Sequence, residues 1–179
     1  MRTRYPVVIA TLALFAACAA APGGQDVEDA AILDPEVLLA NGDAALERNE
    51  LPEAALSYRR AAEASEDEAV AEQATRTAFD HSQMQEDALA ADRWLVLNPT
   101  SEQARRYAGV AALELHRLDV AEGHFAQLLE TAYLSPAAGF LALLPVLNDE
   151  GNAPDVTELF RRLAVRHPKV AEGHYALGS

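Results

Sequence analysis

From about residue 36 onward, apolar residues recur every three or four positions, which is the period of amphipathic helices. No stretch alternates apolar and polar residues for long enough to require a strand. Pro52, Pro136 and Pro154 stand at or near first helical positions, where the missing backbone N–H costs nothing. The pattern predicts helices at 36–48, 52–64, 67–81, 84–97, 100–116, 119–131, 136–149, 154–166 and from about 169.

Residues near the predicted helix ends give further expectations. Ser65 with Glu68, and Thr100 with Gln103, have the spacing of capping boxes, in which each side chain caps the other residue's backbone N–H. Pro145 falls inside a predicted helix, where it should introduce a kink or shift the helix start.

A repeat of small and aromatic residues links the helices. The trio recurs 67 positions later, since Gly42, Ala54 and Tyr58 correspond to Gly109, Ala121 and Phe125. That distance is close to twice the ~34-residue period of a helix-hairpin repeat. We expect small residues where the two helices of a hairpin cross, and a core built by stacking hairpins.

The matching positions resemble the tetratricopeptide-repeat (TPR) family over residues 36–178. The first unit carries Gly42, Leu51, Ala54, Tyr58 and Ala61, and the third carries Gly109, Leu118, Ala121 and Phe125. The second unit is degenerate, with Asp87 or Ala88 at the small crossing position, and the fourth has Val156 there. The resemblance implies an all-α, right-handed α-solenoid of helix hairpins, with about four units in residues 34–179.

The last residues, 170–178, resemble the first helix of a fifth unit, with Leu177 and Gly178 at the Leu-Gly positions. A helix ending there would lack a second helix to pack on. We therefore expect an N-terminal fragment of a longer array. A lone capping helix is the alternative.

The N-terminal residues predict export. Arg2 and Arg4 precede an apolar run at 7–17, whose length of about eleven residues falls short of the ~20 that span a bilayer. Phe15-Ala16-Ala17-Cys18 resembles the lipobox of bacterial lipoproteins. The resemblance implies a signal peptide at 1–17, lipidation of Cys18 and a tether at 18–33. Ala19 in place of an Asp implies the periplasmic face of the outer membrane. The alternative is a simple exported protein with an incidental thiol.

Composition then narrows the classes of function. Lys and Arg number 14 against 28 Asp and Glu, so the net charge is −14, and such a chain repels nucleic-acid phosphates. One cysteine cannot form an internal disulfide or a Cys-based zinc site.

Asp80-His81-Ser82 indicates a helix end and turn rather than a catalytic triad. Glu122-Gly123-His124 and Glu172-Gly173-His174 lie 50 positions apart, which is no repeat multiple. We expect no enzyme activity, metal or cofactor.

The TPR register directs part of the first-helix row toward a concave groove. The candidate groove consists of Glu72, Arg76, Phe79, Arg106, Val110 and Leu113, and the same face carries Asp43, Glu47 and Glu114. Its apolar floor and arginines could hold an extended or helical peptide. Alternatively, Phe79 and Leu113 are ordinary core between units. The pairs Arg59-Arg60 and Arg161-Arg162 are expected to form surface ion pairs, and Trp94 to lie in the core.

Further motifs make the resemblance to TPR proteins more specific. They are residues 71–78 together with Trp94-Leu95, Asn98-Pro99, Ala104-Arg105, Leu118-Asp119, Phe140-Leu141 and the lipobox. These are similar to outer-membrane TPR lipoproteins of Gram-negative bacteria of the LbcA and NlpI type. The resemblance implies an adaptor that binds a periplasmic carboxyl-terminal processing protease and its peptidoglycan hydrolase substrates. Two alternatives stay open: an assembly factor for a secretion, pilus or outer-membrane machine, or the substrate-binding arm of an enzyme whose catalytic domain is missing from this chain.

Overall fold

The computed structural model describes residues 34–150 and 153–178, and within them the chain forms helices and turns with no strand. The predicted signal peptide, Cys18 and the whole tether lie outside the described residues. The helices are α2 (Pro35–Glu47), α3 (Leu51–Ala64), α4 (Glu68–Asp80), α5 (Met84–Leu97), α6 (Glu102–Glu114), α7 (Leu118–Thr131), α8 (Pro136–Glu150), α9 (Ala153–Arg166) and α10 (Ala171–Ala176). The expected all-α class is confirmed.

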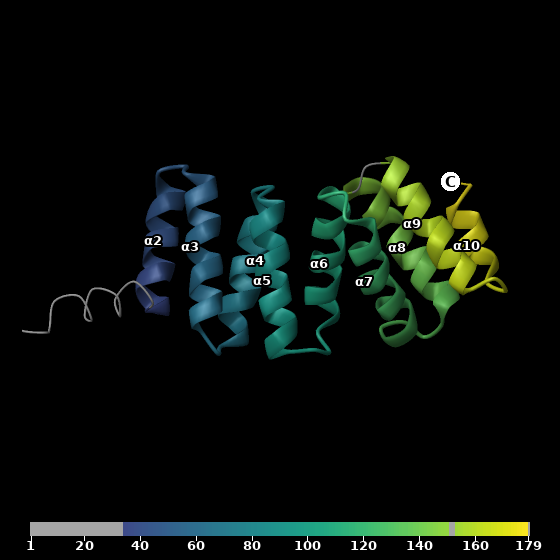
Figure 1. Cartoon of the computed structure of the whole chain (residues 1–179), viewed down its shortest axis with the longest axis horizontal. Helices are drawn as coiled ribbons and strands as arrows, with labels where there is room; N and C mark the ends of the chain where they lie inside the picture. Colours follow the sequence, from purple (N-terminus) through teal and green to yellow (C-terminus); the bar gives the residue numbers. More distant parts are fainter. Residues whose placement is uncertain (1–33, 151–152, 179) are drawn as a thin grey trace, which may run out of the picture.

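The helices pack as consecutive hairpins, which is the TPR-like arrangement. The pairs α2 with α3, α4 with α5, and α6 with α7 pack closely, and α3 with α4 and α5 with α6 join one hairpin to the next. Figure 1 shows these hairpins side by side along the long axis, with α2 and α10 at opposite ends of the row. Pro52, Pro136 and Pro154 stand within the first two positions of α3, α8 and α9, as the sequence predicts.

The first three hairpins close through the same turn. Asn49, Ser82 and His116 each adopt a left-handed conformation, with φ of 59°, 57° and 56°. In each turn the following N–H donates to a carbonyl five residues earlier: Glu50 to Ala45, Gln83 to Ala78, and Arg117 to Ala112. This bond satisfies a carbonyl at the helix end, as in a Schellman motif. The repeat is therefore visible in the backbone as well as in the sequence.

Both predicted capping boxes are wrong, because a residue closer to each helix forms the cap. The side chain of Asp67 accepts the Ala69 N–H at 2.9 Å, while Ser65 accepts the N–H of Asp67 itself. At α6 the cap is Ser101, whose hydroxyl accepts the Ala104 N–H at 3.2 Å. Both capping residues have extended backbone angles, which an N-cap requires. The predicted starts at 67 and 100 therefore move to Glu68 and Glu102.

The predicted glycine–aromatic crossings are confirmed in the first and third hairpins. A Cβ added to Gly42 would lie 3.0 Å from the ring of Tyr58, and Gly109 faces Phe125 in the same way. Tyr58 and Phe125 are both buried. Because glycine has no side chain, the two helices approach until the aromatic ring of one touches the backbone of the other.

The fourth hairpin is looser. Leu143 lies 34 positions after Gly109 and is fully buried, so a large side chain replaces the glycine contact. The backbones of α8 and α9 therefore come close together at few places. The two helices contact each other through side chains such as Phe140 and Phe160, whose ring centroids are 6.4 Å apart. Helix α8 begins at Pro136 and continues through Pro145, so the proline has not shifted its start. Helix α10 packs on α8 and α9, with Gly173 against Phe140.

Candidate functional site

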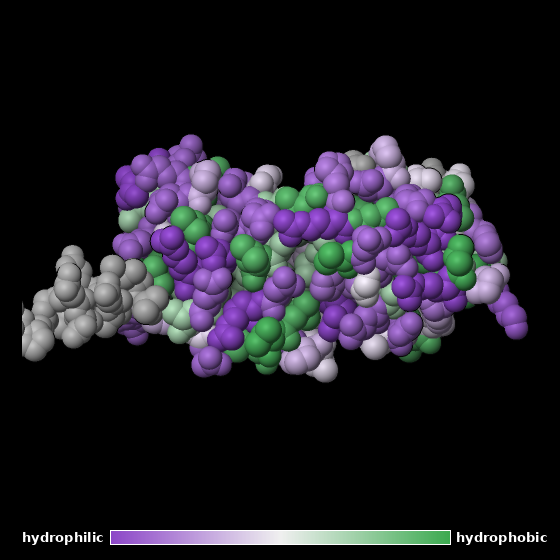
Figure 2. All heavy atoms as spheres, in the orientation of Figure 1, coloured by the Kyte–Doolittle hydropathy of each residue, from purple (hydrophilic) through white to green (hydrophobic). Residues whose placement is uncertain are grey.

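One pocket spans the first helices of three successive hairpins. Its volume is about 170 Å³, and it is lined by Phe79 from α4, by Gln103, Arg106, Tyr107 and Val110 from α6, and by Val146 from α8. We call it the α4–α6–α8 pocket. It brings together three residues of the candidate groove, Phe79, Arg106 and Val110. Figure 2 shows apolar patches over the middle of the array, around α5 and α6, among largely hydrophilic surroundings.

The floor of the pocket is aromatic and firmly packed. The rings of Phe79 and Tyr107 meet edge to face, with centroids 5.0 Å apart and planes at 72°. Tyr107 also lies against Trp94, at a centroid distance of 6.5 Å. Burial raises the pKa of the Tyr107 phenol, which therefore stays neutral at physiological pH. Edge-to-face pairs contribute about 0.5–1.5 kcal/mol beyond simple burial, so this floor should hold its shape.

Arg106 supplies positive charge at the rim of the pocket. Its side chain is exposed and makes no hydrogen bond or ion pair with any residue that the structure describes. Its neighbour Arg105, by contrast, donates to the Pro99 carbonyl at 2.6 Å. The chain carries twice as many acidic as basic residues, yet this arginine has no partner in the described part of the chain, so it is available to a carboxylate or a carbonyl from outside.

The other candidate groove residues lie elsewhere. Leu113 is fully buried within the apolar core of the third and fourth hairpins, so its interpretation as core is confirmed. Glu72 and Arg76 form an ion pair of 2.7 Å on α4 and do not line the pocket. Asp43, on the same predicted face, accepts a hydrogen bond from the Tyr58 hydroxyl. Phe79 serves both interpretations, because it packs against the core and also lines the pocket.

Gln103, Tyr107 and Val146 were missed by sequence reasoning. Along α6, Gln103 lies three positions before Arg106 and Tyr107 lies three positions before Val110, so helical spacing could have found them. Val146 follows Pro145 in the degenerate fourth unit, where no repeat position marks the residue facing the groove. Its place depends on how α8 packs, which the sequence does not reveal.

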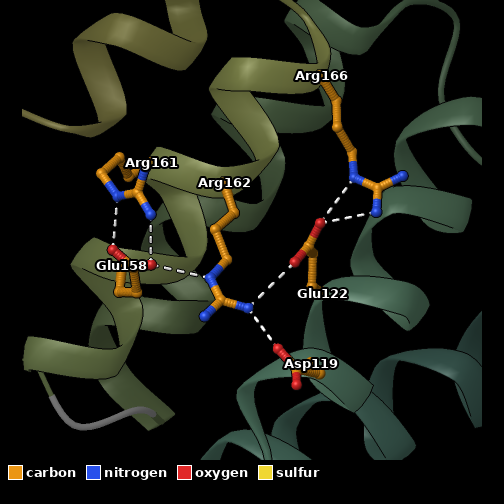
Figure 3. A network of polar contacts seen from close by, with 6 residues as sticks. All are labelled: Asp119, Glu122, Glu158, Arg161, Arg162 and Arg166. Carbon is orange, nitrogen blue, oxygen red and sulfur yellow. Dashed lines mark hydrogen bonds and ion pairs between the residues drawn. The ribbon is translucent and has the colours of Figure 1, made fainter.

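Arg59, Arg161 and Arg162 form the surface ion pairs expected of them, whereas Arg60 forms none with the residues that the structure describes. Arg59 contacts both Glu63 and Glu86 at 2.5 Å. Figure 3 shows the larger network between α7 and α9, in which Arg162 contacts Asp119 at 2.5 Å, Glu158 at 2.9 Å and Glu122 at 3.3 Å. Hydrogen bonds from Arg161 and Arg162 lower the pKa of Glu158 to about 2. Arg59, Arg161 and Arg162 are thus engaged within the protein, which distinguishes them from Arg106.

The remaining candidate chemistry has a structural explanation. Asp80 ends α4, His81 follows it and Ser82 occupies the left-handed turn position, so this trio is a helix end and turn as predicted. Trp94 is buried, and its indole Nε1 donates to Glu68 at 2.7 Å. Within the described ranges 34–150 and 153–178 there is no group of His, Cys, Asp or Glu side chains suited to a metal ion. None of the helices described there is long and apolar enough to cross a bilayer.

Comparison with known proteins adds little to this picture. No protein-family model matches the sequence, and no curated protein matches it. Among solved structures, the chain is similar to one titled "Crystal structure of MamA protein", with 16% sequence identity and a TM-score of 0.47. The match covers 80% of this chain and 79% of that one. The TPR-like arrangement described above therefore rests on this chain's own helix hairpins.

Proposed function

We propose that this chain is a TPR-type scaffold that binds other proteins, and that a partner segment docks in the α4–α6–α8 pocket. The observation that carries the proposal is Arg106, which has no partner among the described residues and stands beside the packed aromatic floor of Phe79 and Tyr107. Three successive hairpins contribute to this pocket. A segment lying along it would therefore contact the array at the place where its first helices line up.

The size of the pocket favours a side chain of a longer segment over a complete small molecule. Sites for drug-sized ligands enclose roughly 300–1,000 Å³, whereas this open pocket measures about 170 Å³. An apolar side chain of the partner would rest on Phe79 and Val110. The guanidinium of Arg106 would donate to a neighbouring carboxylate or backbone carbonyl, and the amide of Gln103 offers one further donor and acceptor.

We further propose that the protein acts as a lipid-anchored adaptor at the periplasmic face of the outer membrane. The lipobox-like Phe15-Ala16-Ala17-Cys18 supports the anchor, and the resemblance to LbcA- and NlpI-type lipoproteins supports the role. In this role the scaffold brings peptidoglycan hydrolases to a carboxyl-terminal processing protease. The scaffold itself would perform no catalysis.

The proposal is tested by affinity purification of the protein from cross-linked cell envelopes, followed by mass spectrometry. The wild type is compared with Arg106→Gln and with Arg60→Gln. Arg60 is a matched control, because it is exposed on α3, makes no hydrogen bond or ion pair with the described residues and lies outside the pocket. We expect Arg106→Gln to lose partners that Arg60→Gln retains.

The identity of the recovered partners separates the two levels of the proposal. A processing protease together with peptidoglycan hydrolases would support the adaptor role. Secretion or outer-membrane assembly components without a protease would overturn that role and leave a scaffold with other partners. Equal recovery of all partners by wild type and Arg106→Gln would overturn docking in the pocket.

A further inference from the structure

A carboxyl group in the second hairpin is buried with no hydrogen-bond partner in the part of the chain that the structure describes. The side chain of Asp87 on α5 is 0% exposed, and neither of its oxygens has a hydrogen-bond partner among the described residues. The corresponding positions in the first and third hairpins are Ala54 and Ala121, both fully buried at the helix crossing. Asp87 thus places an ionisable group where the repeat otherwise places a methyl group.

The surroundings of Asp87 offer its charge no compensation. Helix α5 packs against α3, α4 and α6. On α3 the nearby cation Arg59 is already held by Glu63 and by Glu86, the residue that precedes Asp87. On α6 the phenol of Tyr107 is close enough for the charge of Asp87 to raise its pKa.

The other charged groups in this region lie on α4 and α6, around Tyr107. Asp80 and Arg76 on α4, and Arg106 on α6, also influence the Tyr107 phenol, and none of them forms an ion pair with Asp87. Burial alone raises the pKa of the Asp87 carboxyl to about 8. A neutral carboxylic acid is far less costly to bury than a carboxylate, so the folded protein retains the proton at neutral pH.

We propose that Asp87 is a proton-dependent switch in the second hairpin. While Asp87 is protonated, it packs as a neutral core residue and α5 remains packed against α3, α4 and α6. When it loses its proton, the buried charge draws water into the hairpin and loosens this packing. Trp94 on α5 supports Tyr107, so the loosening reaches the floor of the α4–α6–α8 pocket. This inference goes beyond the proposed function and does not depend on which partner binds.

The direction of the pH effect follows from linkage. The unfolded chain releases the Asp87 proton near pH 3.9, the ordinary value for Asp, whereas the folded protein retains it up to a pH of about 8. The stability that the protonated group confers is complete below pH ~4 and is lost as the pH rises through about 8. Across that interval, the contribution of Asp87 should raise the unfolding equilibrium constant about tenfold per pH unit.

The first experiment is denaturant unfolding of the purified full chain from pH 4 to pH 9. It compares the wild type with Asp87→Asn and with Asp92→Asn, a control at an exposed carboxylate on the same helix. We expect the ratio of the wild-type to the Asp87→Asn unfolding constant to rise about tenfold per pH unit and to level off above pH 8. Asp92→Asn should follow the wild type. Parallel curves for the wild type and Asp87→Asn would overturn the proposal.

A second readout is local and does not require unfolding. The sequence contains one tryptophan, Trp94, which lies two helical turns after Asp87 on the same face of α5. Its fluorescence should change with a midpoint near pH 8 in the wild type and in Asp92→Asn. The change should be absent in Asp87→Asn and in Asp87→Ala, which restores the residue of the neighbouring hairpins. Asp87→Ala keeps the test valid if the Asn variant does not fold. A transition of the same midpoint in all four proteins would overturn the switch.

Discussion

Gly109 of α6 lies directly beneath the ring of Phe125 of α7, so closely that a Cβ added to the glycine would lie 2.8 Å from two ring carbons. Real Cβ atoms essentially never approach another heavy atom that closely, and the ring is fully buried. The third hairpin therefore depends on the missing side chain at this position. The same relationship joins Gly42 to Tyr58 in the first hairpin.

This contact predicts opposite effects for the same substitution at two helical glycines. Gly109→Ala should destabilise the protein by about 1–3 kcal/mol, because the methyl group overpacks the crossing and outweighs the gain in helix propensity. Gly123→Ala on α7 should stabilise by about 0.5–1 kcal/mol, because nothing lies within 4 Å of the added Cβ. Denaturant unfolding of both variants is the measurement. A stabilising Gly109→Ala would contradict the close crossing.

Trp94 should be a main stabilising residue of the second hairpin. It is 2% exposed, lies against Tyr107 and donates its indole N–H to Glu68. Trp94→Ala should destabilise by about 3–5 kcal/mol, whereas Trp94→Phe, which retains most of the ring, should cost distinctly less. Urea denaturation followed by circular dichroism compares the two. Equal losses for Phe and Ala would mean that packing of the ring contributes little.

The network between α7 and α9 predicts an acid-sensitive contribution to stability. Hydrogen bonds from Arg161 and Arg162 depress the pKa of Glu158 to about 2, below its ordinary value of about 4.3 in an unfolded chain. The stabilisation is therefore present above pH ~4.3 and is lost as the pH falls toward 2. Glu158→Gln should lower stability at neutral pH and flatten the pH dependence between 4 and 2. A variant whose acid unfolding curve keeps the wild-type slope would show that the network is too exposed to matter.

Lipidation predicts a simple change in location. Cys18→Ser removes the thiol that the lipobox-like segment would present for acylation, so the protein should move from the membrane fraction to the soluble periplasmic fraction. Several acyl chains anchor a protein stably, whereas one alone binds only marginally. Fractionation of envelopes and mass spectrometry of the mature N-terminus measure the two consequences. Continued membrane association of Cys18→Ser would contradict the lipid anchor.

The sequence predicted the fold best where the repeat pattern is regular. Helical periodicity and the paired small and aromatic residues placed the hairpins, since Gly42 with Tyr58 and Gly109 with Phe125 each report one crossing. The predicted caps failed because several polar residues precede each helix and the sequence does not show which of them reaches the first-turn N–H groups. Ser65 and Asp67 both have extended backbone angles, but Asp67 accepts the Ala69 N–H, whereas Ser65 accepts the N–H of Asp67.

The sequence predicted only part of the candidate site. The helix register brought Phe79, Arg106 and Val110 to one face, but three-dimensional packing decided that Leu113 turns inward and that Val146 completes the pocket. The degenerate position at Asp87 was visible in the sequence. Only the packing of α5 among its neighbours showed that this carboxyl group is buried with no hydrogen-bond partner in residues 34–150 and 153–178.

The most direct test of the central claim is site-specific photo-cross-linking in living cells. A photoreactive amino acid replaces Gln103 in the α4–α6–α8 pocket or, as a control, Val96, which is 68% exposed on α5 and outside the pocket. Docking in the pocket predicts a discrete protein adduct from position 103, none of the same mass from position 96, and loss of the adduct when Arg106→Gln is added. No adduct from position 103, or the same adducts from both positions, would contradict the proposed docking.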